Sequence, residues 1–160
     1  GSAFLGNKQF AEALPILQRV KNRMSNEPVI YTYIGTAQMA LANAESSQQA
    51  KLAKMREAIA TLEEGRRKHS SNSGIRSKLA EANQIAATLD KNIQIDQQNL
   101  ETDLANKRKL RELIAELRVR IREAEEVKRK QGIYPGGYER DKKQLADTIA
   151  EYEKNYGPLK

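Results

Sequence analysis

Two short stretches that read almost alike decide the fold: Phe10-Ala11-Glu12-Ala13-Leu14 and Met55-Arg56-Glu57-Ala58-Ile59. Each places an acid and then an alanine behind a large apolar residue, and in each a leucine follows that alanine by four positions, at Leu17 and Leu62. Apolar residues at spacings of three and four line one face of an α-helix. The two stretches lie 45 residues apart, so the pattern predicts a repeated helical unit.

The composition agrees with a helical chain. Of 160 residues only 13 are Gly or Pro, 31% are charged, 5% are aromatic and none is cysteine. Few turn-forming residues argue against an all-β fold. The lack of cysteine excludes a disulfide scaffold, a cysteine-ligated zinc site and a thiol nucleophile. No apolar run approaches the ~20 residues of a membrane-spanning helix, so we expect an all-α protein without a membrane span.

Between the two stretches lies Tyr31-Thr32-Tyr33-Ile34-Gly35, in which a small residue follows an apolar one. The combination resembles the tetratricopeptide repeat (TPR), a helical hairpin of ~34 residues that stacks into a solenoid. Counting in that family's register from Ala13 and from Ala58 gives the anchors of the next two first helices. They are Tyr31, Ile34 and Gly35, then Arg76, Leu79 and Ala80, of which Arg76 departs from the family's apolar preference. A small residue lets a neighbouring helix approach closely, so we expect close backbone crossings at Gly35 and Ala80.

Two features depart from a regular repeat. The 45-residue spacing exceeds the family's repeat of ~34 residues and so implies an insertion of 11 residues, which we place within Ala42–Lys54. This stretch either lengthens both helices of the hairpin or forms a loop with Ser46 and Ser47 at its tip. Pro15 lies inside an expected helix and predicts a kink or a late helix start.

We therefore assign residues 3–90 to about two and a half TPR-like repeats. Counting backwards from Ala13 puts Phe4 on the aromatic site of a first helix and Gly1 on its small-residue site. Most of that helix would precede the chain, so we expect the sequence to begin inside a repeat of a longer solenoid.

Stacked hairpins leave a concave groove that binds peptides or helices of other proteins. Among the positions that the resemblance assigns to the groove we select Tyr33, Gln38, Arg76, Lys78 and Asn83. Family members that hold a peptide carboxylate have Asn where this chain has Tyr33, and only Lys78 matches by charge. We therefore do not infer binding of a chaperone tail.

Beyond residue 90 the sequence predicts a long charged helix over 91–130. A continuous rod from Lys78 to Lys130 would be roughly 80 Å long at ~1.5 Å per residue, with a break expected near Asn92–Asn99, where Asn and Asp cluster. Glu116–Arg120, Glu125–Arg129 and Glu126–Lys130 have the spacing of helical ion pairs. The apolar face of this arm predicts a seam at Leu110, Ile114, Leu117 and Ile121.

A turn rich in Pro and Gly (131–138) is followed by a helix over 139–157 that carries Leu145, Ile149 and Tyr152. A single short helix is marginal by itself. Either it returns antiparallel onto the seam, or both stripes accept helices of another subunit.

No catalytic constellation is apparent. The single histidine, His69, follows Arg66-Arg67-Lys68 near a helix end, and adjacent acids such as Glu63-Glu64 diverge on a helix. No phosphate-binding loop is present. We expect no enzyme activity, no cofactor and no bound metal.

Three functions remain open. The first is a scaffold that uses the groove and the arm to bind other protein subunits or peptides and to assemble a complex. The second is binding to nucleic acid, suggested by a net charge of +7 and by three basic clusters: Arg66-Arg67-Lys68, Lys107-Arg108-Lys109 and Lys128-Arg129-Lys130. The third is a structural rod that self-associates through the arm.

The resemblance extends to architecture. A last hairpin that continues into a long helix is similar to the repeat scaffold of the nuclear polymerase-associated elongation complex, and bacterial solenoid adaptors fit equally well. The cytoplasm or nucleus is therefore the favoured location, although the absence of cysteine is compatible with any compartment.

Overall fold

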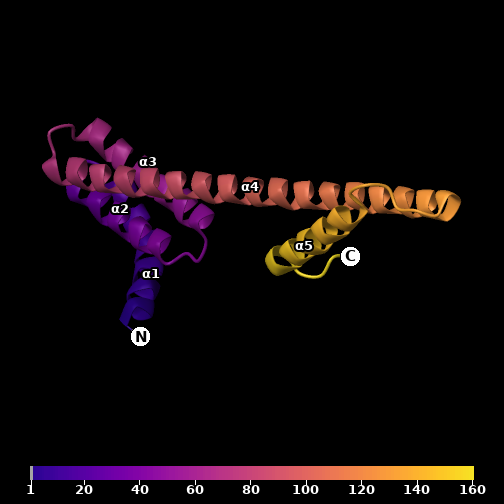
Figure 1. Cartoon of the computed structure of the whole chain (residues 1–160). Helices are drawn as coiled ribbons and strands as arrows, with labels where there is room; N and C mark the ends of the chain where they lie inside the picture. The colour runs from indigo at the N-terminus through magenta and orange to yellow at the C-terminus, as the bar shows by residue number, and fades with distance from the viewer. Residues whose placement is uncertain (1) are drawn as a thin grey trace. The chain divides into compact units, whose positions relative to one another are not determined.

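The computed structural model describes residues 2–160, with side chains described from Gly6 onward, and contains five α-helices and no strand within that range (Figure 1). The helices are α1 (Ser2–Arg23), α2 (Pro28–Asn43), α3 (Gln48–Lys68), α4 (Ser73–Gln131) and α5 (Tyr138–Tyr156). The expectation of an all-α chain is confirmed. The chain divides into two compact units, Gly1–Asp96 and Gln97–Lys160, which we describe separately.

The helix boundaries of the first unit keep the spacing that the sequence shows. Helix α1 ends at Arg23 and α3 ends at Lys68, 45 residues later; α2 begins at Pro28 and α4 begins at Ser73, again 45 residues later. The pair α1–α2 and the pair formed by α3 with the first turns of α4 therefore share the position of their turn within the 45-residue spacing, and we call them the first and the second copy. Each residue of the first copy has an equivalent 45 positions further on.

Local chemistry sets where these helices start. Pro28 suits the first turn of α2, where a backbone N–H would lack a partner in any case. The Ser47 hydroxyl accepts a hydrogen bond from the Ala50 backbone N–H (3.1 Å) and caps α3. The Asn72 side-chain oxygen accepts one from the Ile75 N–H (2.9 Å) at the start of α4. Each cap satisfies a donor that the helix itself leaves free.

The inserted stretch and the proline both have clear positions. Ser46 and Ser47 lie in the turn between α2 and α3, and the remaining residues of Ala42–Lys54 are helical apart from Ala44 and Glu45. Helix α1 runs through Pro15 rather than starting late. The proline leaves the Ala11 carbonyl without its helical donor, and because both residues are exposed, water can replace that bond.

Helices α2 and α3 approach each other closely at two reciprocal contacts. A Cβ atom on Gly35 would lie 2.8 Å from Cγ and Cδ2 of Leu62, and one on Gly65 would lie 2.7 Å from Cβ and Cγ of Tyr31. Each glycine thus makes room for a fully buried side chain of the opposite helix. Tyr31 comes before Gly35 in α2, but its partner Gly65 comes after Leu62 in α3, so the two helices are antiparallel.

The start of α4 does not repeat this contact. Leu79 is buried, like its equivalent Ile34, but Ala80 and Arg76, the equivalents of Gly35 and Tyr31, are exposed. The expectation of a close crossing at Ala80 is therefore wrong. Helix α4 continues where a hairpin would turn back, so no helix covers this face within the first unit, and the polar Arg76 suits it.

Helix α4 also passes through Asn92–Asn99 without the expected break, and the division between the two units falls within that stretch. In the second unit its contacts with α5 run in reverse chain order. Arg120 pairs with Asp141 (2.7 Å), and the Tyr156 hydroxyl donates to the Asp103 carbonyl (3.3 Å). Helix α5 therefore lies antiparallel to this part of α4. Gly132 and Gly137 hold the positive φ angles (82° and 92°) of the connecting turn.

The seam predicted from the sequence lies between these two helices, with Ile114, Leu117 and Tyr152 buried and Leu110, Ile121, Leu145 and Ile149 half-buried. Ala124, which continues the same apolar spacing, is also buried, and the structure adds three buried residues that the spacing missed: Tyr138, Asp141 and Thr148.

The ion pairs along this part of α4 differ from the predicted set in one place. The pairs Glu116–Arg120 (3.9 Å) and Glu126–Lys130 (3.4 Å) form as predicted. Arg129 pairs with Glu126 instead of Glu125, and Glu125 accepts a hydrogen bond from the Tyr138 hydroxyl (3.3 Å).

The reciprocal glycine contacts lead to a stability prediction. Gly65→Ala is expected to lower the free energy of unfolding by about 1–3 kcal/mol, a typical cost of overpacking, because Tyr31 Cβ is fixed to the backbone and cannot rotate away. Gly35→Ala is expected to cost less, because the Leu62 side chain can shift. Urea denaturation of the purified variants measures both effects.

Gly6→Ala is the matched control, since Gly6 is also helical but has nothing within 4 Å of the added Cβ. It is expected to raise stability by up to ~1 kcal/mol through helix propensity. An equal gain in all three variants would contradict the close approach of α2 and α3.

Candidate functional site

An apolar hollow of about 340 Å³ lies between α1 and α2 in the first unit. It is lined by Leu17, Val20, Met24, Glu27, Val29, Ile30 and Tyr33. Six of these seven side chains are apolar or aromatic, and Glu27 supplies the single charge. We call this feature the α1–α2 hollow.

Several lining side chains are far more exposed than large apolar groups usually are. Met24 is 51% exposed, Val29 47% and Tyr33 57%, and Ile16, one helical turn before Val20 on α1, is 60% exposed. Grouped exposed apolar side chains are typical of surfaces that bind another molecule.

The second copy of the arrangement shows that the fold does not require this exposure. The residues 45 positions after Met24, Val29 and Tyr33 are His69, Gly74 and Lys78. Lys78 is half-buried and pairs with Glu81 (3.0 Å). The equivalent positions of the second copy thus carry small or polar residues, and the apolar character is specific to the α1–α2 hollow.

Of the five groove residues predicted from the sequence, Tyr33 lines this hollow. Gln38 is buried within the first unit, and its side-chain oxygen has no hydrogen-bond partner among the described residues. Arg76 and Asn83 are exposed on α4, and Lys78 forms its ion pair there. The structure therefore does not gather the five residues into one site.

Sequence reasoning missed the other residues of the hollow. Val29 and Tyr33 on α2 are spaced i, i+4, which places both side chains on one helical face, and Met24 directly follows α1 at the same spacing from Val20. A comparison of each position with the one 45 residues later would have shown where this apolar character is not shared.

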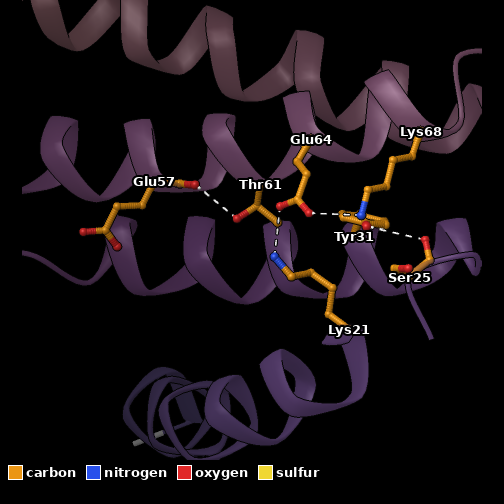
Figure 2. A network of polar contacts seen from close by, with 7 residues as sticks. All are labelled: Lys21, Ser25, Tyr31, Glu57, Thr61, Glu64 and Lys68. Carbon is orange, nitrogen blue, oxygen red and sulfur yellow. Dashed lines mark hydrogen bonds and ion pairs between the residues drawn. The ribbon is translucent and has the colours of Figure 1, made fainter. Parts of the chain in front are cut away.

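A polar network beside the hollow fixes α1, α2 and α3 to one another (Figure 2). Lys21 on α1 donates to Glu64 on α3 (2.9 Å), and Lys68 lies 3.5 Å from the same carboxylate. Both ammonium groups stand over the ring of the fully buried Tyr31, at 5.9 and 5.8 Å from its centroid.

The carbonyl of Ser25, in the turn between α1 and α2, receives two donors. The Tyr31 hydroxyl lies 3.4 Å away and His69 Nε2 lies 3.1 Å away. A carbonyl oxygen only accepts, so His69 carries a hydrogen on Nε2. The turn that borders the hollow is thus tied to the turn after α3.

The charges of the network favour the ionised forms of its members. The hydrogen bond from Lys21 lowers the pKa of Glu64, assisted by the positive charges of Lys21 and Lys68. The pKa of Lys68 is raised, first by its hydrogen bond with Tyr31 and then by Glu64.

The described part of the chain contains no group of three His, Asp or Glu side chains placed to hold a metal ion. Within the same part of the chain, no helix combines the length and the apolar character that crossing a bilayer requires. No protein-family model, curated protein or solved structure matches the chain.

The Glu64 carboxylate leads to a prediction on acid stability. A carboxylate with a lowered pKa stabilises the folded state above its ordinary pKa of 4.5, and this contribution is lost as the pH falls through the folded-state pKa. Glu64→Gln is therefore expected to be less stable than the unaltered chain at neutral pH, with the difference shrinking below pH 4.5.

Thermal unfolding at a series of pH values measures this difference. Glu12→Gln is the control, because Glu12 forms only an exposed pair with Lys8 (3.8 Å), and such pairs contribute little. A stability difference for Glu64→Gln that stays constant across the acid range would refute the stabilising role of the ionised network.

Proposed function

We propose that this chain is a non-catalytic protein-interaction scaffold whose first unit, a TPR-like stack of helices, binds an apolar segment of a partner protein in the α1–α2 hollow. The observation that carries the proposal is the difference between the two copies. Met24, Val29 and Tyr33 remain exposed where the equivalent positions hold His69, Gly74 and Lys78. Apolar surface that the described residues leave uncovered is typical of a binding site.

The rigidity of the site supports binding. The network of Lys21, Glu64 and Tyr31 holds the helices that form the walls, and the Ser25 carbonyl anchors the adjoining turn. A preformed apolar site loses little conformational entropy when a ligand binds. Tyr33 is the expected anchor, because tyrosine is among the residues that most often dominate binding energy.

Nucleic acid is a weaker candidate for the partner. Within the basic clusters Arg66 donates to Glu63 (2.9 Å), Lys68 lies beside Glu64, and Arg129 and Lys130 pair with Glu126. These carboxylates offset part of the positive charge of the first and third clusters, which phosphate groups would require. The apolar hollow, by contrast, suits a protein segment.

The proposal predicts a specific loss of binding in Tyr33→Lys. Peptides selected by display on the purified chain are expected to bind this variant at least about tenfold more weakly, a loss of ~1.4 kcal/mol. The fold is expected to persist, since Lys78 occupies the equivalent position in the second copy. Isothermal titration measures the affinity, and circular dichroism monitors the helices.

Tyr134→Lys is the control, because Tyr134 is also an exposed tyrosine (45%) but belongs to the second unit. Selected peptides that bind both variants equally well, or a selection that yields no binder, would refute the proposed site.

A further inference from the structure

The two copies of the arrangement also indicate what kind of segment the hollow accepts. The equivalents of Leu17, Val20 and Ile30 are Leu62, Gly65 and Ile75. In the second copy helix α2 covers these positions. Leu62 and Ile75 are fully buried, and Ile75 shares a core cluster with Tyr31 and Ile34 of α2.

The contacts in that covered copy are specific. Gly35 of α2 lies against Leu62, Tyr31 of α2 lies against Gly65, and the Tyr31 ring stands 5.8 Å from the ring of His69, the equivalent of Met24. The part of the surface that corresponds to Leu17, Val20 and Met24 is thus covered by an antiparallel α-helix in the second copy, whereas in the first copy Leu17 and Val20 are half-buried and Met24 is exposed.

We propose that the α1–α2 hollow binds an amphipathic α-helix of a partner protein, antiparallel to α1, as α2 lies against α3. This inference rests on the proposed function and adds the conformation of the bound segment. A helix presents apolar side chains at positions i, i+3, i+4 and i+7, the pattern used when helices dock into grooves.

The side chains of the hollow define the helix further. Leu62 packs against Gly35 of α2, so the bound helix is expected to place a small residue opposite Leu17, the equivalent of Leu62. Val20 stands at the position where the second copy has Gly65, so a residue as large as Tyr31 does not fit opposite Val20.

The charges beside the hollow favour an acidic flank on the bound helix. Arg19 and Arg23 are exposed on α1 and stand at the positions equivalent to Glu64 and Lys68. A partner helix with carboxylates along the side that faces α1 complements these two cations, whereas the lining residue Glu27 favours a neutral or basic residue near the start of α2.

The first experiment compares two display libraries selected on the full 160-residue chain. One library randomises a single face of a stable helical scaffold. The other displays linear random peptides with prolines fixed at intervals of a few residues, so that they cannot form a helix. Helical binders with a small residue and an acidic flank, weakened at least tenfold by Tyr33→Lys and unaffected by Tyr134→Lys, are the expected result.

Binders found only among the proline-containing linear peptides would overturn the helical assignment and leave the proposed function in place. An absence of binders in both libraries would overturn both. A dimer of this chain that Tyr33→Lys dissociates, or a longer form of the polypeptide whose own helix fills the hollow, would also overturn the assignment to a partner protein.

A second experiment uses α2 itself as the probe. A labelled peptide of residues 28–43 is expected to bind the Val20→Gly variant at least tenfold more tightly than the unaltered chain, because glycine recreates the space that Gly65 gives to Tyr31. Val20→Ala should give an intermediate affinity, and it remains informative if glycine unfolds α1.

Val119→Gly is the matched control, since it places a glycine in a helix at an exposed valine (42%) of the second unit. Equal binding of the probe to the Val20 variants and to Val119→Gly would overturn the correspondence between the hollow and the surface that α2 covers.

Discussion

The close approach of α2 and α3 is the constraint on which the first unit depends. It exists because Gly35 and Gly65 have no side chains, so that Leu62 and Tyr31 can lie against the opposite backbone. Both of these side chains are fully buried, and each belongs to a different hydrophobic cluster, so the two contacts connect the packing of the whole unit. Well-packed interiors tolerate additional atoms poorly.

Burial of Tyr31 also explains the arrangement of charge around it. Its hydroxyl needs an acceptor, which the Ser25 carbonyl supplies, and two lysines stand over its ring with Glu64 balancing them. Because these groups come from α1, α2 and α3, one buried aromatic residue fixes the walls of the hollow. The site available for binding is therefore a consequence of the same packing that stabilises the helices.

Sequence reasoning located one residue of the candidate site, Tyr33, through the register of the repeat. Gln38 was assigned to the same surface but is buried, because a register gives the face of a helix and not the neighbour that covers it. Asp141 was missed because a buried carboxylate interrupts an apolar pattern, and its burial is compensated by pairs with Arg120 and Arg140 that the pattern does not reveal. Val20 and Met24 were overlooked because the sequence pattern of an apolar residue is the same whether its side chain faces a core or an open hollow.

The sequence by itself determined the helical class, the 45-residue spacing and the turn at Gly132–Gly137, since these depend on local periodicity and backbone preferences. Only the tertiary structure decided which equivalent positions are covered. Gly35 and Ala80 hold the same place in the repeat, yet one is pressed against Leu62 and the other faces solvent. Burial depends on whether another helix follows in space, and that information lies in the packing of distant segments rather than in the residues around each position.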